Sequence, residues 1–252
     1  MKYRNVLLTG VMVLLAAYLP AAAQADHNID LAMQAIKEIQ HGYNTRPMSF
    51  DIVYTYSNEH TPGKVLDSMK GRIELSGADS RCLLRNTESI HNSRYNVILF
   101  AEDKIMYLAK SDTAVNSADL LQPIRTALQT AGVTDCGISY QGSKKTVQIS
   151  FRAGAPYKSL QITVDTLSGH LQAMRYVVKT ALLMDAAAGG DATPGEGYEE
   201  YATVQAVFEN YDDTPPGQDR FDEQAFFQRE GTDLKVTAAY QDYKIFIGSP
   251  NL

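Results

Sequence analysis

The chain has 252 residues, and a hydrophobic fraction of 44% with 21% charged residues predicts a folded globular protein. Its 23 Lys and Arg against 29 Asp and Glu give a formal net charge of −6. This acidic balance argues against nucleic acid and anionic lipid headgroups as partners.

The first 25 residues have the features of a cleaved signal peptide. Lys2 and Arg4 precede an uncharged stretch over residues 6–19, and Ala23-Gln24-Ala25 has the small-x-small pattern that a signal peptidase cuts. We expect a mature chain that begins at Asp26 and is periplasmic, or secreted where there is no outer membrane. No cysteine lies at the cut and no later apolar run is long enough to cross a bilayer, so we expect neither a lipid anchor nor a transmembrane segment in the mature chain.

An amphipathic helix is predicted at the start of the mature chain. Asn28 can cap this helix, and Ile29, Met33 and Ile36 recur at helical spacing. Gly42 can adopt the left-handed conformation that often ends a helix. One helix is therefore expected to lead the domain.

After this helix the apolar period changes from near 3.6 to 2. Phe50, Ile52, Tyr54 and Tyr56 recur at every second position, which is typical of a strand. Short links separate this run from the ones that follow, and short links favour antiparallel neighbours. Strands are expected over residues 49–57, 65–75, 81–86, 96–101 and 104–110.

The second half of the chain combines a helical insertion with further strands. Leu120, Leu121, Ile124 and Leu128 share one side of a helix predicted over residues 117–131. Strands are expected over residues 137–140, 146–151, 160–165, 170–180 and 198–211, then a short helix over 221–229 and one or two strands within 234–247. We find no internal repeat and no linker between two cores, so residues 26–252 are predicted to form a single domain.

The segment from Asp185 to Gly197 is rich in Ala, Gly and acidic residues and contains Pro194. This composition cannot bury enough surface to order itself, so a mobile acidic loop is expected there. The loop begins a longer acidic stretch, because residues 185–230 hold 12 acidic residues against Arg220 and Arg229. Solvation explains this charge most simply, and the alternative is a docking surface for a basic partner.

The order of these elements resembles that of a known family of exported proteins. The runs SFDIVYTYSN, KGRIELSG and YNVILFAEDKIMYLAKS look like the opening meander of the periplasmic lipoprotein carrier LolA and its relatives, and LQITVDTLSGHLQAMRY is similar to a later hairpin of that family. The resemblance covers roughly residues 29–180. It implies an α+β fold, with a strongly curved antiparallel sheet (an incomplete β-barrel) and covering helices that enclose an apolar cavity for acyl chains. It does not by itself imply lipoprotein transfer, because related folds bind different ligands.

Methionine and tyrosine side chains in the strands are the candidates for lining such a cavity, because both suit variable apolar ligands. The runs 97–100 and 105–108 are apolar on both faces, so one face can meet helices while the other meets a ligand or a partner. The alternative is an ordinary packed core, since central strands are commonly apolar on both sides. The candidate ligand-binding residues are Tyr54, Tyr56, Met69, Met106, Met174 and Tyr176.

Three arginines, Arg81, Arg85 and Arg94, lie close together in the sequence. An arginine at the edge of a cavity can bind an acyl carbonyl through forked hydrogen bonds. The alternative, which we favour, is an exposed outer face on which these arginines pair with acids such as Glu74 or Glu88.

The mature chain contains two cysteines, Cys82 and Cys136. In an oxidising compartment they can form a disulfide, which would close a long loop and contribute on the order of 4 kcal/mol to stability. The alternative is two separate buried thiols, because free cysteine packs well in cores.

The sequence contains none of the common catalytic or cofactor motifs. It has no G-x-S-x-G elbow, no H-E-x-x-H, no Walker loop and no G-x-G-x-x-G after a strand. The five histidines show no metal-ligand spacing. An enzyme, a metal site and a cofactor are therefore not expected, although a cleft that gathered Asp, His and Ser would favour a hydrolase.

Together these features predict an exported, non-enzymatic carrier or chaperone-like protein that binds a lipid, lipoprotein or other amphipathic ligand in an apolar cavity. The alternative is a structural or interaction protein of the cell envelope, with a filled barrel and an acidic C-terminal segment that docks an envelope protein. A hollow or a packed interior on the inner side of the sheet distinguishes the two hypotheses.

Overall fold

The computed structural model describes residues 28–41, 46–111, 128, 132–188, 196–231, 233–249 and 252. The predicted signal peptide lies outside these residues, as does the predicted helix over 117–131 except for Leu128. In the described part of the chain, no helix combines the length and apolar character needed to cross a bilayer.

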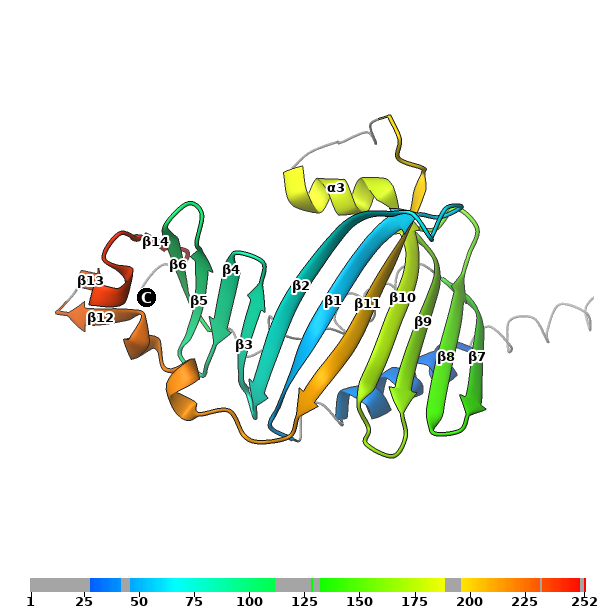
Figure 1. Ribbon diagram of the computed structural model, residues 1–252, viewed down its shortest axis with the longest axis horizontal. Helices are drawn as coiled ribbons and strands as arrows, with labels where there is room; N and C mark the ends of the chain where they lie inside the picture. Colours follow the sequence, from blue (N-terminus) through cyan, green and yellow to red (C-terminus); the bar gives the residue numbers. More distant parts are fainter. Residues whose placement is uncertain are drawn as a thin grey trace, which may run out of the picture.

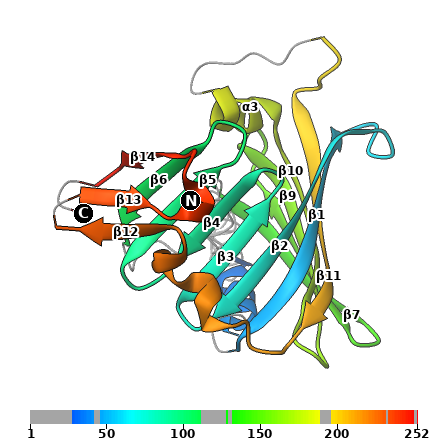
Figure 2. The same ribbon diagram turned by 60° about the vertical axis from the view of Figure 1, so that its left-hand side comes forward.

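One large curved sheet of twelve strands forms most of the described structure (Figure 1). Its order is β14-β6-β5-β4-β3-β2-β1-β11-β10-β9-β8-β7, and every neighbouring pair is antiparallel except β14 with β6. The outer strands β14 and β7 do not pair with each other, so the sheet bends into an open, incomplete barrel (Figure 2). The strands are β1 (Met48–Asn58), β2 (Val65–Ser76), β3 (Asp79–Leu84), β4 (Thr87–His91), β5 (Tyr95–Phe100), β6 (Ile105–Lys110), β7 (Val133–Gln141), β8 (Lys144–Phe151), β9 (Tyr157–Asp165), β10 (Leu171–Lys179), β11 (Tyr201–Asp212) and β14 (Lys244–Ile247).

Two of the hairpins depend on glycine. Two residues, beginning with Gly77, connect β2 to β3, and two residues, beginning with Gly142, connect β7 to β8. Gly77 has a φ of 63° and Gly142 a φ of 58°, values that side chains disfavour and that tight two-residue hairpins require. These turns fix the antiparallel register of the strands beside them.

The predicted fold class is confirmed, and so are most of the predicted strands. Strand β4 was not predicted because its sequence, Thr-Glu-Ser-Ile-His, has one strongly apolar residue. The predicted short helix over 221–229 is wrong. This stretch contains the last residue of one 3-10 helix, η1 (Gln218–Phe221), the whole of a second, η2 (Glu223–Ala225), and most of strand β12 (Phe227–Glu230). The pattern failed there because Phe226 and Phe227 are both buried, which no single helix face explains.

Helix α3 (Thr180–Ala188) follows β10 and lies across the end of the sheet (Figure 1). Residues 185–188 of the predicted acidic loop form its last turn, so the loop prediction is wrong for these four residues. Residues 189–195 of that prediction lie outside the described residues.

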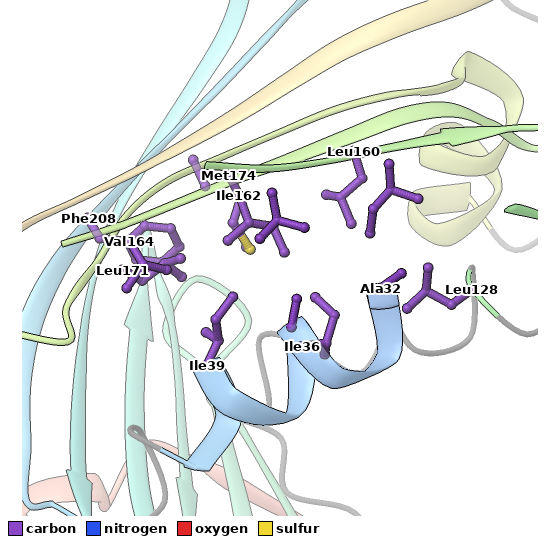
Figure 3. Packing of buried hydrophobic residues seen from close by; sticks show 14 of the residues in the cluster. Ala32, Ile36, Ile39, Leu128, Leu160, Ile162, Val164, Leu171, Met174 and Phe208 are labelled. Carbon is purple, nitrogen blue, oxygen red and sulfur yellow. The ribbon is translucent and has the colours of Figure 1, made fainter. Parts of the chain in front are cut away.

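The main hydrophobic core lies on the concave face of the sheet, which we define as the face that carries Phe50, Ile52 and Tyr54 on β1. The predicted N-terminal helix is present over residues 28–41 and lies inside the curve of the sheet (Figure 2). Its side chains Ala32, Ile36 and Ile39 face the strands in Figure 3. This helix therefore closes part of the concave face.

A second core lies on the opposite, convex face at the other end of the sheet. There the C-terminal residues after β11 fold back over β4, β5 and β6, and β12 pairs with β13 (Asp233–Val236) in a separate two-stranded ribbon (Figure 2). The buried members of this cluster are Ile90, Val97, Leu99, Met106, Leu108, Phe226 and Phe227. Strand β14 then joins β6 in parallel, so the C-terminal segment covers one face and extends one edge.

Candidate ligand-binding face

The concave face is apolar from β10 across to β3 because the strand registers align their inward side chains. Tyr54 on β1 pairs with Met69 on β2 and with Ala206 on β11, and Ala206 pairs with Met174 on β10. Paired residues point to the same side of a sheet, so these four side chains form one row. The next row contains Tyr56, Val204 and Tyr176 and ends on β2 at the exposed carboxylate of Asp67.

Five of the six predicted ligand-binding residues therefore share the concave face: Tyr54, Tyr56, Met69, Met174 and Tyr176. The sixth, Met106, does not. It pairs with Leu99, is fully buried and belongs to the convex cluster under the C-terminal segment. Met106 was assigned wrongly because its strand is apolar on both faces, and alternation alone does not reveal which face the chain later covers.

The helix seals one part of the concave face and leaves another part only half covered. Along β1, Met48, Phe50 and Ile52 are at most 1% exposed, whereas Tyr54 and Tyr56 on the same face are only partly buried. Met174 is 3% exposed and lies above the helix in Figure 3. The half-covered part is the end of the concave face nearer α3.

Aromatic side chains dominate this half-covered part. The rings of Tyr157 and Tyr176 have centroids 6.4 Å apart, and those of Tyr56 and Tyr198 are 6.1 Å apart. Tyr198 is 45% exposed, and Leu182 of α3 is 42% exposed. The end of the concave face therefore presents apolar surface to solvent.

Burial changes the acidity of the tyrosines on this face. It raises the pKa of Tyr176 to about 12, with a smaller contribution from the neighbouring Tyr157. The pKa of Tyr54 is raised strongly, first by burial and then by Tyr176 and Cys82. Burial also raises the pKa values of Tyr56 and Tyr157. All four hydroxyls are therefore protonated donors at neutral pH.

Tyr157 was not predicted as part of this site. Counting back in twos from Leu160 and Ile162 places residue 158, not 157, on the concave face. A register irregularity between β9 and β10 makes Tyr157 pair with Val178, which puts Tyr157 on the concave side. The sequence carries no signal for that irregularity beyond Pro156 just before the strand.

The concave surface also continues along β5, β6 and β14. Ile98 pairs with Tyr107, and Tyr107 pairs with Phe246 of β14. Phe100 is 37% exposed and Phe246 is 52% exposed. The two faces of β5 and β6 thus differ: one is covered by the C-terminal segment and not by a helix, and the other is partly open.

Both cysteines are free. Cys82 pairs with Ile73, Cys136 pairs with Ile149, and both pack in the concave core. The sequence left open a disulfide or two separate thiols, and in the structure the two thiols are separate.

Arg81 pairs with Glu74 and Glu88, the acids named from the sequence, but these pairs are largely buried and do not form the exposed face that was favoured, and Arg85 pairs instead with Asp67. Glu74 is 4% exposed and pairs with Arg220 of the C-terminal segment and with Arg81, whose Nη1 lies 3.2 Å away. The Nε of Arg81 donates to Glu88 at 2.6 Å. These contacts attach the C-terminal segment to the sheet.

A second buried carboxylate attaches the same segment further along the chain. Glu223 is 4% exposed, accepts a hydrogen bond from Nδ2 of Asn92 at 2.8 Å and pairs with Arg94. Asn92 also donates to the carbonyl oxygen of Phe221 at 2.9 Å. At least one carboxylate of the acidic stretch, that of Glu223, therefore stabilises the fold.

A polar cleft of about 620 Å³ on the convex face brings Ser168 and His170 together. Nε2 of His170 lies 3.1 Å from Asp213, and the imidazole stacks on Tyr211 with centroids 4.0 Å apart. A catalytic triad needs the serine hydroxyl on the imidazole, but here the Ser168 hydroxyl accepts from the backbone N–H of His170 at 3.2 Å. Within the described residues, no group of three or more His, Cys, Asp and Glu side chains is placed to hold a metal ion.

No family model matches the chain, and no curated protein matches it. Several solved structures are similar in fold. They include an uncharacterized conserved protein from Thermus thermophilus (7% identity, 85% of this chain and 98% of that chain, TM-score 0.44) and a LolA superfamily protein from Nitrosomonas europaea (6% identity, 75% and 97%, TM-score 0.30). A third is the lipoprotein LppX from Mycobacterium tuberculosis (10% identity, 75% and 98%, TM-score 0.37). The family that the sequence resembles is thus among the structural neighbours, but at these TM-scores the conclusions about function depend on this chain's own side chains.

Proposed function

We propose that the chain is an exported, non-enzymatic carrier or chaperone-like protein that holds a lipid, lipoprotein or other amphipathic ligand against the concave face of its sheet. The observation that carries this proposal is the half-covered end of that face. Tyr54, Tyr56, Met69 and Tyr176 lie side by side on adjoining strands without the complete burial of Phe50 and its neighbours.

The mechanism would be reversible sequestration. Removing apolar surface from water contributes about 0.8 kcal/mol for each buried CH₂ group, so each added CH₂ should tighten binding about fourfold while the chain still fits. The polar end of the ligand would stay near the exposed Tyr198, whose ring lies beside that of Tyr56. Affinity that rises with acyl length and then reaches a plateau would report the depth of the site.

Extraction of the purified protein with organic solvent, followed by mass spectrometry, tests the proposal directly, with a co-purified amphiphile as the expected result. Uptake of a fluorescent fatty acid provides the second measurement. Clean extracts together with no uptake would contradict a carrier function.

Two neighbouring leucines of β3 supply a matched pair of variants. Leu84 packs against the concave core, whereas Leu83 lies on the other face and is 41% exposed. Leu84→Glu should abolish or strongly reduce uptake, because it places a charge on the concave face, one row away from Tyr54. Leu83→Glu should bind like the unmodified protein, and equal loss in both variants would point to damage to the sheet and not to the site.

The alternative is a structural or interaction protein of the envelope that docks a partner through its acidic C-terminal stretch. It is favoured by the exposed carboxylates of Glu196, Glu209 and Asp219 in that stretch. Deleting residues 185–197 distinguishes the two functions. The deletion should abolish partner capture from an envelope extract under this alternative, whereas a carrier should still bind its amphiphile.

A further inference from the structure

The half-covered end of the concave face carries a group of tyrosine hydroxyls that follows two rows of the sheet. Tyr56 on β1 and Tyr176 on β10 both pair with Val204 of β11, which lies between them. Adjacent strands are about 4.8 Å apart, so the two tyrosine backbones are roughly 10 Å apart. Tyr54 lies in the neighbouring row on β1, two residues from Tyr56.

The hydroxyl oxygen of Tyr56 is buried and has no hydrogen-bond partner among the described residues. Thr180 is near enough to lower the pKa of Tyr56 slightly, against the larger effect of burial. The Thr180 hydroxyl itself, however, donates to the carbonyl oxygen of Glu199 at 2.6 Å and does not reach hydrogen-bond geometry with Tyr56. The buried donor of Tyr56 is thus unused.

Tyr54 and Tyr176 lie on the same face and are partly buried, although neither hydroxyl is among the fully buried oxygens that lack a partner. Their pKa values are raised by burial and by nearby tyrosine or thiol groups, and no hydrogen bond from the described residues contributes to either shift. Tyr201 and Tyr211 show the usual solution for a buried tyrosine, since they donate to the carbonyl oxygens of Ala155 at 3.1 Å and Leu171 at 2.6 Å.

A hydrogen-bond donor that has no partner in an apolar surface indicates that a ligand must supply an acceptor there. Buried polar groups are nearly always paired, because an unpaired one loses its hydration without compensation. Met69, Met174, Val204 and Ala206 beside these tyrosines are uncharged. The charged neighbour, Asp67, pairs with Tyr56 across the ladder, is exposed and forms an ion pair with Arg85, so an anionic headgroup would find no free counter-charge there. A neutral acceptor on an otherwise apolar ligand fits both observations.

We propose that two tyrosine hydroxyls, that of Tyr56 and that of Tyr54 or Tyr176, bind the acyl carbonyl oxygen of the ligand, as in a fatty ester or fatty amide. This proposal rests on the proposed function, because it names the ligand class of the same site. The tyrosines would select acylated amphiphiles over alkyl amphiphiles of equal length, whereas the apolar wall accepts both.

The test compares three ligands that share a fourteen-carbon chain: 1-monomyristoylglycerol (ester), N-myristoylethanolamine (amide) and 1-O-tetradecylglycerol (ether). Each is titrated below its critical micelle concentration against the full mature chain loaded with the neutral dye N-phenyl-1-naphthylamine, and displacement of the dye is measured. The ester or the amide should bind about tenfold more tightly than the ether, as two hydrogen bonds of ordinary net strength predict. The preferred carbonyl ligand identifies the linkage.

The variants Tyr54→Phe, Tyr56→Phe and Tyr176→Phe each remove one oxygen and keep the ring. Together they should bring the carbonyl ligands to the affinity of the ether and leave the ether unchanged. Tyr95→Phe is the control, because Tyr95 packs on the convex side against Phe227 with centroids 5.3 Å apart.

The outcomes separate the two proposals. Equal affinity for all three ligands in the unmodified protein overturns carbonyl recognition and leaves the carrier function intact. Failure of all three ligands to displace dye, or of the dye to bind, counts against the carrier function itself. An equal loss for ester and ether in the triple variant also overturns carbonyl recognition, since it assigns the tyrosines to packing alone.

Discussion

The two hydrophobic clusters lie on opposite faces of one sheet, and they are covered in different ways. The convex cluster is closed by aromatic side chains such as Phe226 and Phe227, which are 5% and 3% exposed, and by the buried carboxylates of Glu74 and Glu223. The concave cluster is closed by the N-terminal helix at one end, but at the other end it presents partly buried tyrosines. A completely covered cluster serves stability, whereas a partly covered one retains surface for a ligand.

The polar groups of the two faces show the same difference. On the convex face the buried carboxylates have their charged partners, Arg220 and Arg81 for Glu74 and Arg94 for Glu223. On the concave face the buried hydroxyl of Tyr56 has none among the described residues. Satisfied groups hold a fold in one arrangement, and the unsatisfied group marks a place where another molecule would complete the bonding.

Truncating the convex cluster should have the largest effect on stability and little effect on binding. Phe227→Ala should lower the free energy of unfolding by about 3 to 5 kcal/mol, because it leaves a cavity under the C-terminal ribbon. Urea unfolding measures this loss, and dye binding under folding conditions should be unchanged. Phe246→Ala, at a position that is 52% exposed, is the matched control and should cost less than about 1 kcal/mol.

A somewhat smaller loss of stability is expected when the buried ion pair between Glu74 and the C-terminal segment is removed. Glu74→Gln should lower the free energy of unfolding by about 2 kcal/mol, because hydrogen bonds to a charged group are worth more than neutral ones. Limited proteolysis should cut the chain after residue 212 faster than in the unmodified protein. Asp67→Asn removes the partner of Arg85 at an exposed pair and should change stability by less than about 1 kcal/mol. Equal effects from both substitutions would show that burial of Glu74 is not what matters.

The concave side of the sheet was predictable wherever alternation was clear. Phe50, Ile52, Tyr54 and Tyr56 alternate with more polar neighbours, and the sequence therefore placed them correctly on one face of one strand. Where both faces are apolar, as at Met106, the sequence contains no information about which side a distant segment will cover. The face of β6 that carries Met106 is covered by Phe226 and Phe227, which lie far along the chain.

Contacts between distant segments were the part that could not be predicted. Strand β14 lies parallel to β6, and its pairing partners are more than a hundred residues away, so no local period specifies them. The ion pair between Glu74 and Arg220 likewise joins residues that are far apart in the sequence. The unusual state of the tyrosines was also hidden, because a missing hydrogen-bond partner is a property of three-dimensional surroundings and not of residue type.

The buried tyrosines should make stability depend on alkaline pH. Tyr176 ionises at a pKa of about 12 in the folded chain, against about 10 in an unfolded one, so the unfolded state binds fewer protons above pH 10. The contribution of Tyr176 to stability is therefore fully present well below pH 10 and is lost as the pH rises from about 10 towards 12, by about 1 kcal/mol between pH 10 and pH 11. Tyr176→Phe should remove its share of this decrease, as measured by urea unfolding at pH 8 and pH 11. An unchanged pH dependence would show that Tyr176 is not buried in solution.

The smallest effect is expected from the thiols of the concave cluster. Cys82 and Cys136 are free, and burial raises the pKa of each thiol, with Asp135 adding to the rise at Cys136. Buried, protonated thiols react slowly, so a reducing agent should shift Tm by less than about 1 °C and thiol reagents should modify both residues only on unfolding. A disulfide closing so long a loop would contribute on the order of 4 kcal/mol, which a reducing agent would reveal as a large decrease in Tm. Such a decrease would mean that the concave face is held together covalently across its open curve, and a face that is locked in this way would open less readily for a ligand than the one described here.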